Sequence, residues 1–202
     1  MKLWLKELKI TFKDRKFFIS TIQAFALLIV SLTINFYAGT YATERASSPV
    51  TDIVLSNIRV FDVNGIFIFG LVFFWLFFIV FCIFKPRKMP FIVKSIGLFV
   101  IIRSIFVILT HIGPFPGGDV ITTSKVIEHL TFGGDLFFSG HTGLPFLMCL
   151  IFWDDIILRY LFLAGSIVFG IIVLMGHLHY SIDVLSAFFY NLYNFSFDKV
   201  FL

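Results

Sequence analysis

Six long apolar runs constrain what this 202-residue chain can fold into more than any other feature of it. They cover residues 17–37, 64–84, 91–111, 136–153, 160–176 and 179–197. A transmembrane helix needs about 20 mostly apolar residues. The runs are continuous rather than alternating, which is typical of helices and not of the strands of a closed barrel. The sequence therefore predicts an all-α membrane protein with six transmembrane helices.

Charge is scarce and unevenly placed. Charged residues make up 14% of the chain, against about 25% in soluble proteins, so we expect one membrane domain over residues 17–202. Residues 1–16 are basic and amphipathic, and are expected to lie on the anionic cytoplasmic leaflet. The net charge of +4 does not indicate a nucleic-acid partner. Cys82 and Cys149 lie inside apolar runs, so no disulfide framework is expected.

The positive charges also predict the topology. Basic residues cluster in the N-terminal segment and in the loop that holds Lys85, Arg87 and Lys88. By the positive-inside rule both regions are cytoplasmic, and with six spans the C-terminus is cytoplasmic as well. The loops 40–63, 113–134 and 176–178 should then share the opposite, exoplasmic face.

Two histidines and one aspartate fall at the depth of that face. His179 and Asp183 are four residues apart, so they share one side of a helix. A carboxylate there can fix the tautomer of the imidazole and leave its other nitrogen as a nucleophile toward phosphorus. His141, at the start of another run, could transfer protons to and from the hydroxyl groups. Ionisable groups are costly in a membrane, so this set predicts a functional site.

Neighbouring residues could complete the site. Ser139 and Gly140 precede His141, and N–H groups at a helix start bind phosphate well. Arg103 is predicted to hold the substrate phosphate or a site carboxylate; the alternatives are a snorkelling arginine and an ion pair with Asp183. Asp135 is a candidate for substrate binding or for a helix cap.

Other polar residues carry weaker expectations. Asp52 and Glu128 are interpreted as solvated loop acids, and His177 has no derivable role. No His-x-x-x-His or Cys pair indicates a metal site, so neither metal nor cofactor is expected.

Two segments resemble a known family. Residues 134–142 (GDLFFSGHT) are similar to the third signature of the sphingomyelin synthases, and residues 176–184 (GHLHYSIDV) are similar to the fourth. That family is a branch of the type 2 phosphatidic acid phosphatase (PAP2) superfamily. Residues 49–52 (PVTD) and Arg103 resemble its first two signatures more weakly. Phe138 stands before Ser139 where the plain phosphatases have proline, and no arginine precedes His179, which favours the transferase branch.

The resemblance implies a PAP2-like bundle of six helices with both termini cytoplasmic. It also implies a metal-independent transfer of phosphocholine or phosphoethanolamine from a glycerophospholipid to ceramide. In that reaction His179 would form a phosphohistidine, Asp183 would orient it, and His141 would handle the hydroxyl groups. We expect a minimal version of the family, and such an enzyme need not use ceramide; diacylglycerol is another lipid acceptor. A hydrolase of lipid phosphates and a non-enzymatic membrane protein that retains the fold stay open as alternatives.

Overall fold

The computed structural model describes residues 13–117, 136–189 and 191. Within these ranges every regular element is a helix. In chain order the elements are α2 (Arg15–Glu44), the 3-10 turn η1 (Leu55–Asn57), α3 (Asn64–Phe84), the 3-10 turn η2 (Pro86–Lys88), α4 (Met89–Leu109), α6 (Gly140–Ile151) and α7 (Ile156–Met175). Residues 181–189 form a further helical segment after α7. The all-α class predicted from the sequence is confirmed for these residues.

Three helical stretches in the described part are long and apolar enough to cross a membrane. They are Arg15–Glu44, Pro86–Leu109 and Ile156–Met175. Asn64–Val80 and Gly140–Ile151 are apolar but shorter, and most of the sixth run lies outside the described residues. Many large apolar side chains are exposed on the outer faces, for example Phe69, Phe73 and Ile157. Such extensive exposed apolar surface indicates a membrane protein, but the prediction of six complete spans is not confirmed.

Helix boundaries follow local capping residues. Asp14 accepts a hydrogen bond from the backbone N–H of Lys16 and starts α2, which is longer than the expected 17–37. Ser139 caps α6, so that helix begins four residues later than the predicted run 136–153. The predicted amphipathic segment 1–16 falls mostly outside the described residues.

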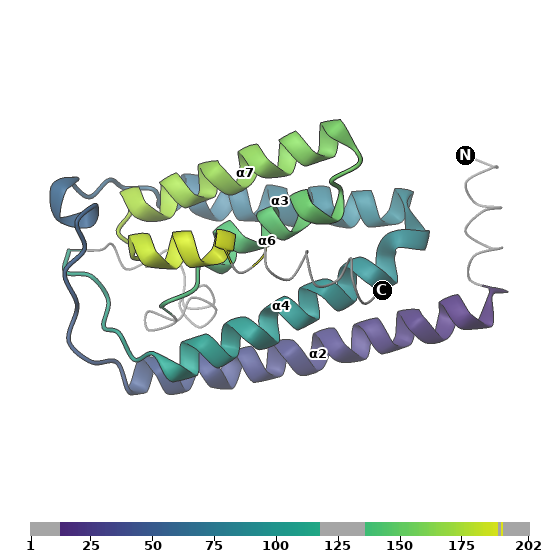
Figure 1. Cartoon of the computed structure of the whole chain (residues 1–202), viewed down its shortest axis with the longest axis horizontal. Coiled ribbons are helices and arrows are strands. Elements are labelled where there is room, and N and C mark those ends of the chain that lie inside the picture. Colours follow the sequence, from purple (N-terminus) through teal and green to yellow (C-terminus); the bar gives the residue numbers. More distant parts are fainter. Residues whose placement is uncertain (1–12, 118–135, 190, 192–202) are drawn as a thin grey trace.

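The helices form two groups that lie alongside each other (Figure 1). In one group α2 packs along α4, and Gly97 permits this approach because a Cβ there would lie 3.0 Å from Cγ of Leu27. The other group contains α3, α6, α7 and the helical segment 181–189 (Figure 1). Gly143 of α6 contacts the ring of Phe99 on α4, where a Cβ would lie only 2.6 Å away. Aromatic residues fill the core, and Phe99 meets Phe138 edge to face.

The loops at one end of the bundle are joined by hydrogen bonds. The hydroxyl of Tyr180 donates to the carbonyl oxygen of Gly113 (2.7 Å), and the backbone N–H of Val50 donates to that hydroxyl (3.2 Å). The backbone N–H of Phe61 donates to the carbonyl of Met175. Phe115 also meets the ring of His177 edge to face, so the described parts of the three loops predicted to share one face are in contact.

Candidate active site

His179 and Asp183 form a buried hydrogen-bonded pair. Nδ1 of His179 lies 3.0 Å from Oδ2 of Asp183, and both side chains are almost completely shielded from solvent. The same carboxylate oxygen accepts the backbone N–H of Tyr180 at 3.0 Å. With the proton on Nδ1, the Nε2 atom of His179 keeps its lone pair. The pairing inferred from the i, i+4 spacing is confirmed.

Asp183 does not pair with Arg103. Its Oδ2 atom is bound to His179 and Tyr180, and Oδ1 is buried without a hydrogen-bond partner among the described residues. The suggested ion pair between Asp183 and Arg103 is therefore wrong. The carboxylate instead uses Oδ2 for contacts within its own turn, to His179 and to the backbone N–H of Tyr180.

His141 faces this pair from the first turn of α6. The ring centroids of His141 and His179 are 6.4 Å apart, with an angle of 52° between the ring planes. Phe67 of α3 packs against the other side of His141, with centroids 4.4 Å apart. Nδ1 of His141 is buried and has no hydrogen-bond partner in the described part of the chain. The structure thus brings together the three side chains chosen as catalytic from sequence.

Ser139 ties the start of α6 to the helix that carries Asp183. Its backbone N–H donates to the carbonyl oxygen of Asp183 (3.2 Å), and its hydroxyl accepts the N–H of Thr142 (3.4 Å). Ser139 is fully buried, so its main visible role is to position His141. Gly140, in contrast, borders a cavity, and a Cβ there would lie 3.2 Å from Nε of Arg103.

Arg103 bridges the two groups of helices. Nε donates to the carbonyl oxygen of Phe138 (3.0 Å), and Nη1 donates to Oδ1 of Asn35 on α2 (2.8 Å). These bonds to defined partners hold the buried guanidinium beside Gly140 and argue against the snorkelling alternative. Asp135, the other predicted substrate-binding residue, lies outside the described residues.

Asp52 was expected to be a solvated loop acid, and this expectation is wrong. It is only 7% exposed. Its Oδ2 atom accepts both the backbone N–H and the hydroxyl of Ser181, each at 2.7 Å, while Oδ1 accepts the N–H groups of Val54 and Leu55. Burial alone would raise the pKa of Asp52, but the hydrogen bonds, led by that from the Ser181 hydroxyl, hold the pKa below its ordinary value of 3.8.

His177 occupies a left-handed backbone position at the end of α7. Its φ is 52°, its N–H donates to the carbonyl of Leu174, and the N–H of Leu178 donates to that of Val173. This is the Schellman pattern of helix termination, in which glycine usually takes the left-handed residue. Here glycine stands one position earlier, because a Cβ at Gly176 would overlap the side chain of Val63.

An apolar cavity of about 380 Å³ borders His141, whereas His179 and Asp183 do not line it. Its polar lining consists of Asn35, Arg103, Gly140 and His141. The rest is apolar and comes from both helix groups: Leu28, Leu32, Leu71, Phe74, Trp75, Ile96, Phe99, Val100, Leu144, Pro145 and Phe169. One polar wall and a long apolar interior suit an amphiphilic ligand.

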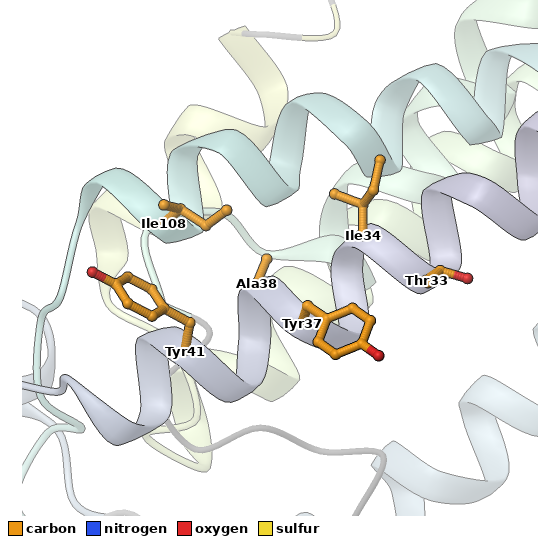
Figure 2. Close-up of a pocket in the computed structure, with 6 residues that line it drawn as sticks. All are labelled: Thr33, Ile34, Tyr37, Ala38, Tyr41 and Ile108. Atoms are coloured by element: carbon orange, nitrogen blue, oxygen red, sulfur yellow. The ribbon is translucent and has the colours of Figure 1, made fainter.

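A second hollow, of about 430 Å³, lies on the outer face between α2 and α4. Figure 2 shows Tyr37 and Tyr41 of α2 and Ile108 of α4 along it, with Thr33 at one end. It contains none of the candidate catalytic side chains, so the smaller cavity is the one that bears on chemistry. In the described part of the chain, no three His, Cys, Asp or Glu side chains gather in a way that could hold a metal ion.

Comparison with known proteins adds one finding. A family model described as PAP2 superfamily C-terminal matches residues 133–200. The matched segment contains His141, His179 and Asp183, and it supports the PAP2 superfamily for this part of the chain. No curated protein and no solved structure matches the chain. Together with the exposed apolar helices, the match over residues 133–200 indicates a membrane protein and suggests phosphatase- or phosphotransferase-type chemistry.

Sequence reasoning missed two contributors to this site. Asn35 was not noticed, although an amide side chain inside an apolar run is itself a signal, since polar groups are expensive in a membrane. The contact of Asp52 with Ser181 joins positions 129 residues apart, so periodicity could not indicate it; the signal available in the sequence was the weak resemblance of residues 49–52 to a family signature.

Proposed function

We propose that this protein is a membrane lipid phosphotransferase of the sphingomyelin synthase type. It would move a phosphocholine or phosphoethanolamine head group from a glycerophospholipid to a lipid hydroxyl such as that of ceramide or diacylglycerol. The observation that carries the proposal is the His179–Asp183 pair, 3.0 Å apart, facing His141 across a ring separation of 6.4 Å.

The first half of the reaction forms a phosphohistidine. Nε2 of His179 attacks phosphorus, and the bond from phosphorus to the diacylglycerol oxygen breaks. His141 gives a proton to that oxygen, so diacylglycerol leaves as a neutral alcohol. Asp183 stabilises the positive charge that develops on the His179 ring, as the carboxylate does in other histidine-based sites.

The second half reverses these steps with a new alcohol. His141, now a base, takes the proton of the acceptor hydroxyl, and the oxygen attacks phosphorus. The bond from phosphorus to nitrogen breaks, and His179 returns to its starting state. Arg103 would hold the phosphate oxygens by charge-assisted hydrogen bonds. No step needs a metal, so turnover should persist in EDTA.

The cavity supports a lipid substrate. Its polar wall lies next to His141, and its apolar interior extends along α2 from Asn35 to Leu28. That is seven residues, or about 10 Å of helix. An acyl chain could lie there while its head group meets the histidines. Because the basic N-terminal segment and the loop with Lys85, Arg87 and Lys88 are expected to be cytoplasmic, we further propose that the site faces the exoplasmic side. Both lipids would then come from the exoplasmic leaflet.

The test is product analysis with purified protein. The protein is incubated with head-group-labelled phosphatidylcholine or phosphatidylethanolamine in EDTA, with ceramide, with diacylglycerol and with neither. A labelled lipid product that depends on the acceptor supports the transferase. Release of water-soluble phosphocholine or phosphoethanolamine regardless of acceptor would establish the hydrolase instead. Absence of any turnover would favour the non-enzymatic alternative.

A further inference from the structure

We propose that Asn35 is a substrate-binding residue whose side-chain amide donates a hydrogen bond to an ester carbonyl of the donor lipid. The proposal rests on the proposed function and names one contact within it. Asn35 lies in the second half of α2, in a mostly apolar stretch whose other polar side chains, Ser31 and Thr33, are hydroxyls bonded to the helix's own carbonyl groups. It lines the cavity together with Arg103, Gly140 and His141.

The orientation of the Asn35 amide follows from its neighbours. A guanidinium can only donate hydrogen bonds, so the atom 2.8 Å from Nη1 of Arg103 is the oxygen, Oδ1. The hydroxyl of Ser104 lies 3.5 Å from the same oxygen. The NH2 group must therefore point away from Arg103.

That NH2 group is available to a ligand. Nδ2 of Asn35 makes no hydrogen bond with the described residues. It is also absent from the set of polar atoms that are both fully buried and unpartnered, so part of its surface stays accessible. An amide N–H facing an apolar space without a partner is unfavourable, and an acceptor on a bound ligand would relieve that cost. A neutral donor of this kind suits a carbonyl oxygen.

The position of Asn35 selects which part of the lipid it meets. Arg103 bonds to Phe138 on the α6 side and to Asn35 on the α2 side. The phosphate must lie on the α6 side, between His141 and His179, for the proposed chemistry. Asn35 lies on the other side of Arg103 from that phosphate. It would therefore meet the lipid at the glycerol esters, where the acyl chains are attached.

The experiment compares two lipids that differ only at the proposed acceptor. One is a diacyl phospholipid, and the other is the dialkyl ether phospholipid with the same head group and chain length. Wild-type protein should favour the ester over the ether by about three- to tenfold in kcat/KM, the value of one hydrogen bond. Asn35→Asp keeps an oxygen for Arg103 but removes the donor. Both lipids carry the same phosphate, so the added charge affects them alike, and the preference should fall to about one.

Thr33→Val is the matched control. Thr33 is also a polar residue of α2, but it is exposed and borders the outer hollow (Figure 2). This variant should keep the ester preference of the wild type. An active wild-type enzyme without ester preference would overturn the role of Asn35, as would a preference that Asn35→Asp leaves unchanged. Failure of the wild type to process either lipid would instead contradict the proposed function.

Discussion

Asp52 and Ser181, 129 residues apart, are joined by two hydrogen bonds of 2.7 Å that end on one carboxylate oxygen. Ser181 is the first residue of the helical segment that carries Asp183, and it lies two residues after His179. A carboxylate at a helix start satisfies free N–H groups and complements the helix dipole. The loop after α2 thus fixes the segment on which the candidate nucleophile depends, which makes Asp52 a positioning residue.

Replacing Asp52 by Asn should weaken both stability and turnover. The carboxylate accepts four hydrogen bonds, whereas an amide has only one acceptor oxygen and presents an NH2 group to donors. We expect the free energy of unfolding to fall by about 2 kcal/mol and kcat to fall more than KM changes. Ser181→Ala, which removes only the hydroxyl, should cost about 1 kcal/mol. Thermal unfolding in detergent and steady-state kinetics measure both; a variant with wild-type values would show that the contact positions nothing.

The pH dependence of stability should carry the signature of Asp52. Its pKa is held below 3.8 in the folded protein, so its stabilising contribution is complete above the unfolded value and is lost as the pH falls through the folded value. The melting temperature of the wild type should therefore drop more steeply than that of Asp52→Asn below about pH 4. Parallel curves for the two proteins in that range would contradict the depressed pKa.

Asp183→Asn should reduce kcat by at least about a hundredfold while the protein stays folded. The amide can still contact Nδ1 of His179, but it favours the wrong tautomer. Asp155→Asn is the matched control, because Asp155 makes an exposed ion pair with Lys85 and caps α7. An Asp183→Asn enzyme as active as this control would reduce Asp183 to a structural residue.

Single cysteines should report the orientation in the membrane. Ser56 and Lys88 are both exposed; Ser56 belongs to the loop between α2 and α3, and Lys88 to the basic turn η2. In a background with Cys82 and Cys149 replaced, we expect a membrane-impermeant thiol reagent to label Ser56→Cys in intact cells and Lys88→Cys only after lysis. The reverse pattern would put the site on the cytoplasmic face and move the substrate lipids to the other leaflet.

The sequence was most informative where chemistry is local. The contact between His179 and Asp183 was predicted from their spacing of four residues, although the helical segment begins only at Ser181 and His179 lies in the bend before it. The start of α6 was less predictable, since hydrophobicity runs on through Leu136, Phe137 and Phe138 while the Ser139 cap decides where the helix begins.

Contacts between distant segments could not be predicted. Arg103 was recognised as costly in an apolar run, but two of its acceptors, Asn35 and the carbonyl of Phe138, come from another helix and from a loop. Asp52 has the same polarity as any loop acid, and only the fold reveals that it is buried against Ser181. Such contacts depend on tertiary packing, which hydrophobic periodicity does not encode.

The most direct test of the account is whether His179 carries the head group during turnover. Purified protein is mixed briefly with head-group-labelled phospholipid without an acceptor, quenched in base, where a phosphoramidate survives, and digested for mass spectrometry. We expect a phosphocholine or phosphoethanolamine adduct on His179 that disappears on addition of the acceptor lipid or of acid. His179→Ala should form no adduct and should keep less than a few per cent of wild-type turnover. Normal turnover by His179→Ala, or an adduct on another residue, would contradict this expectation.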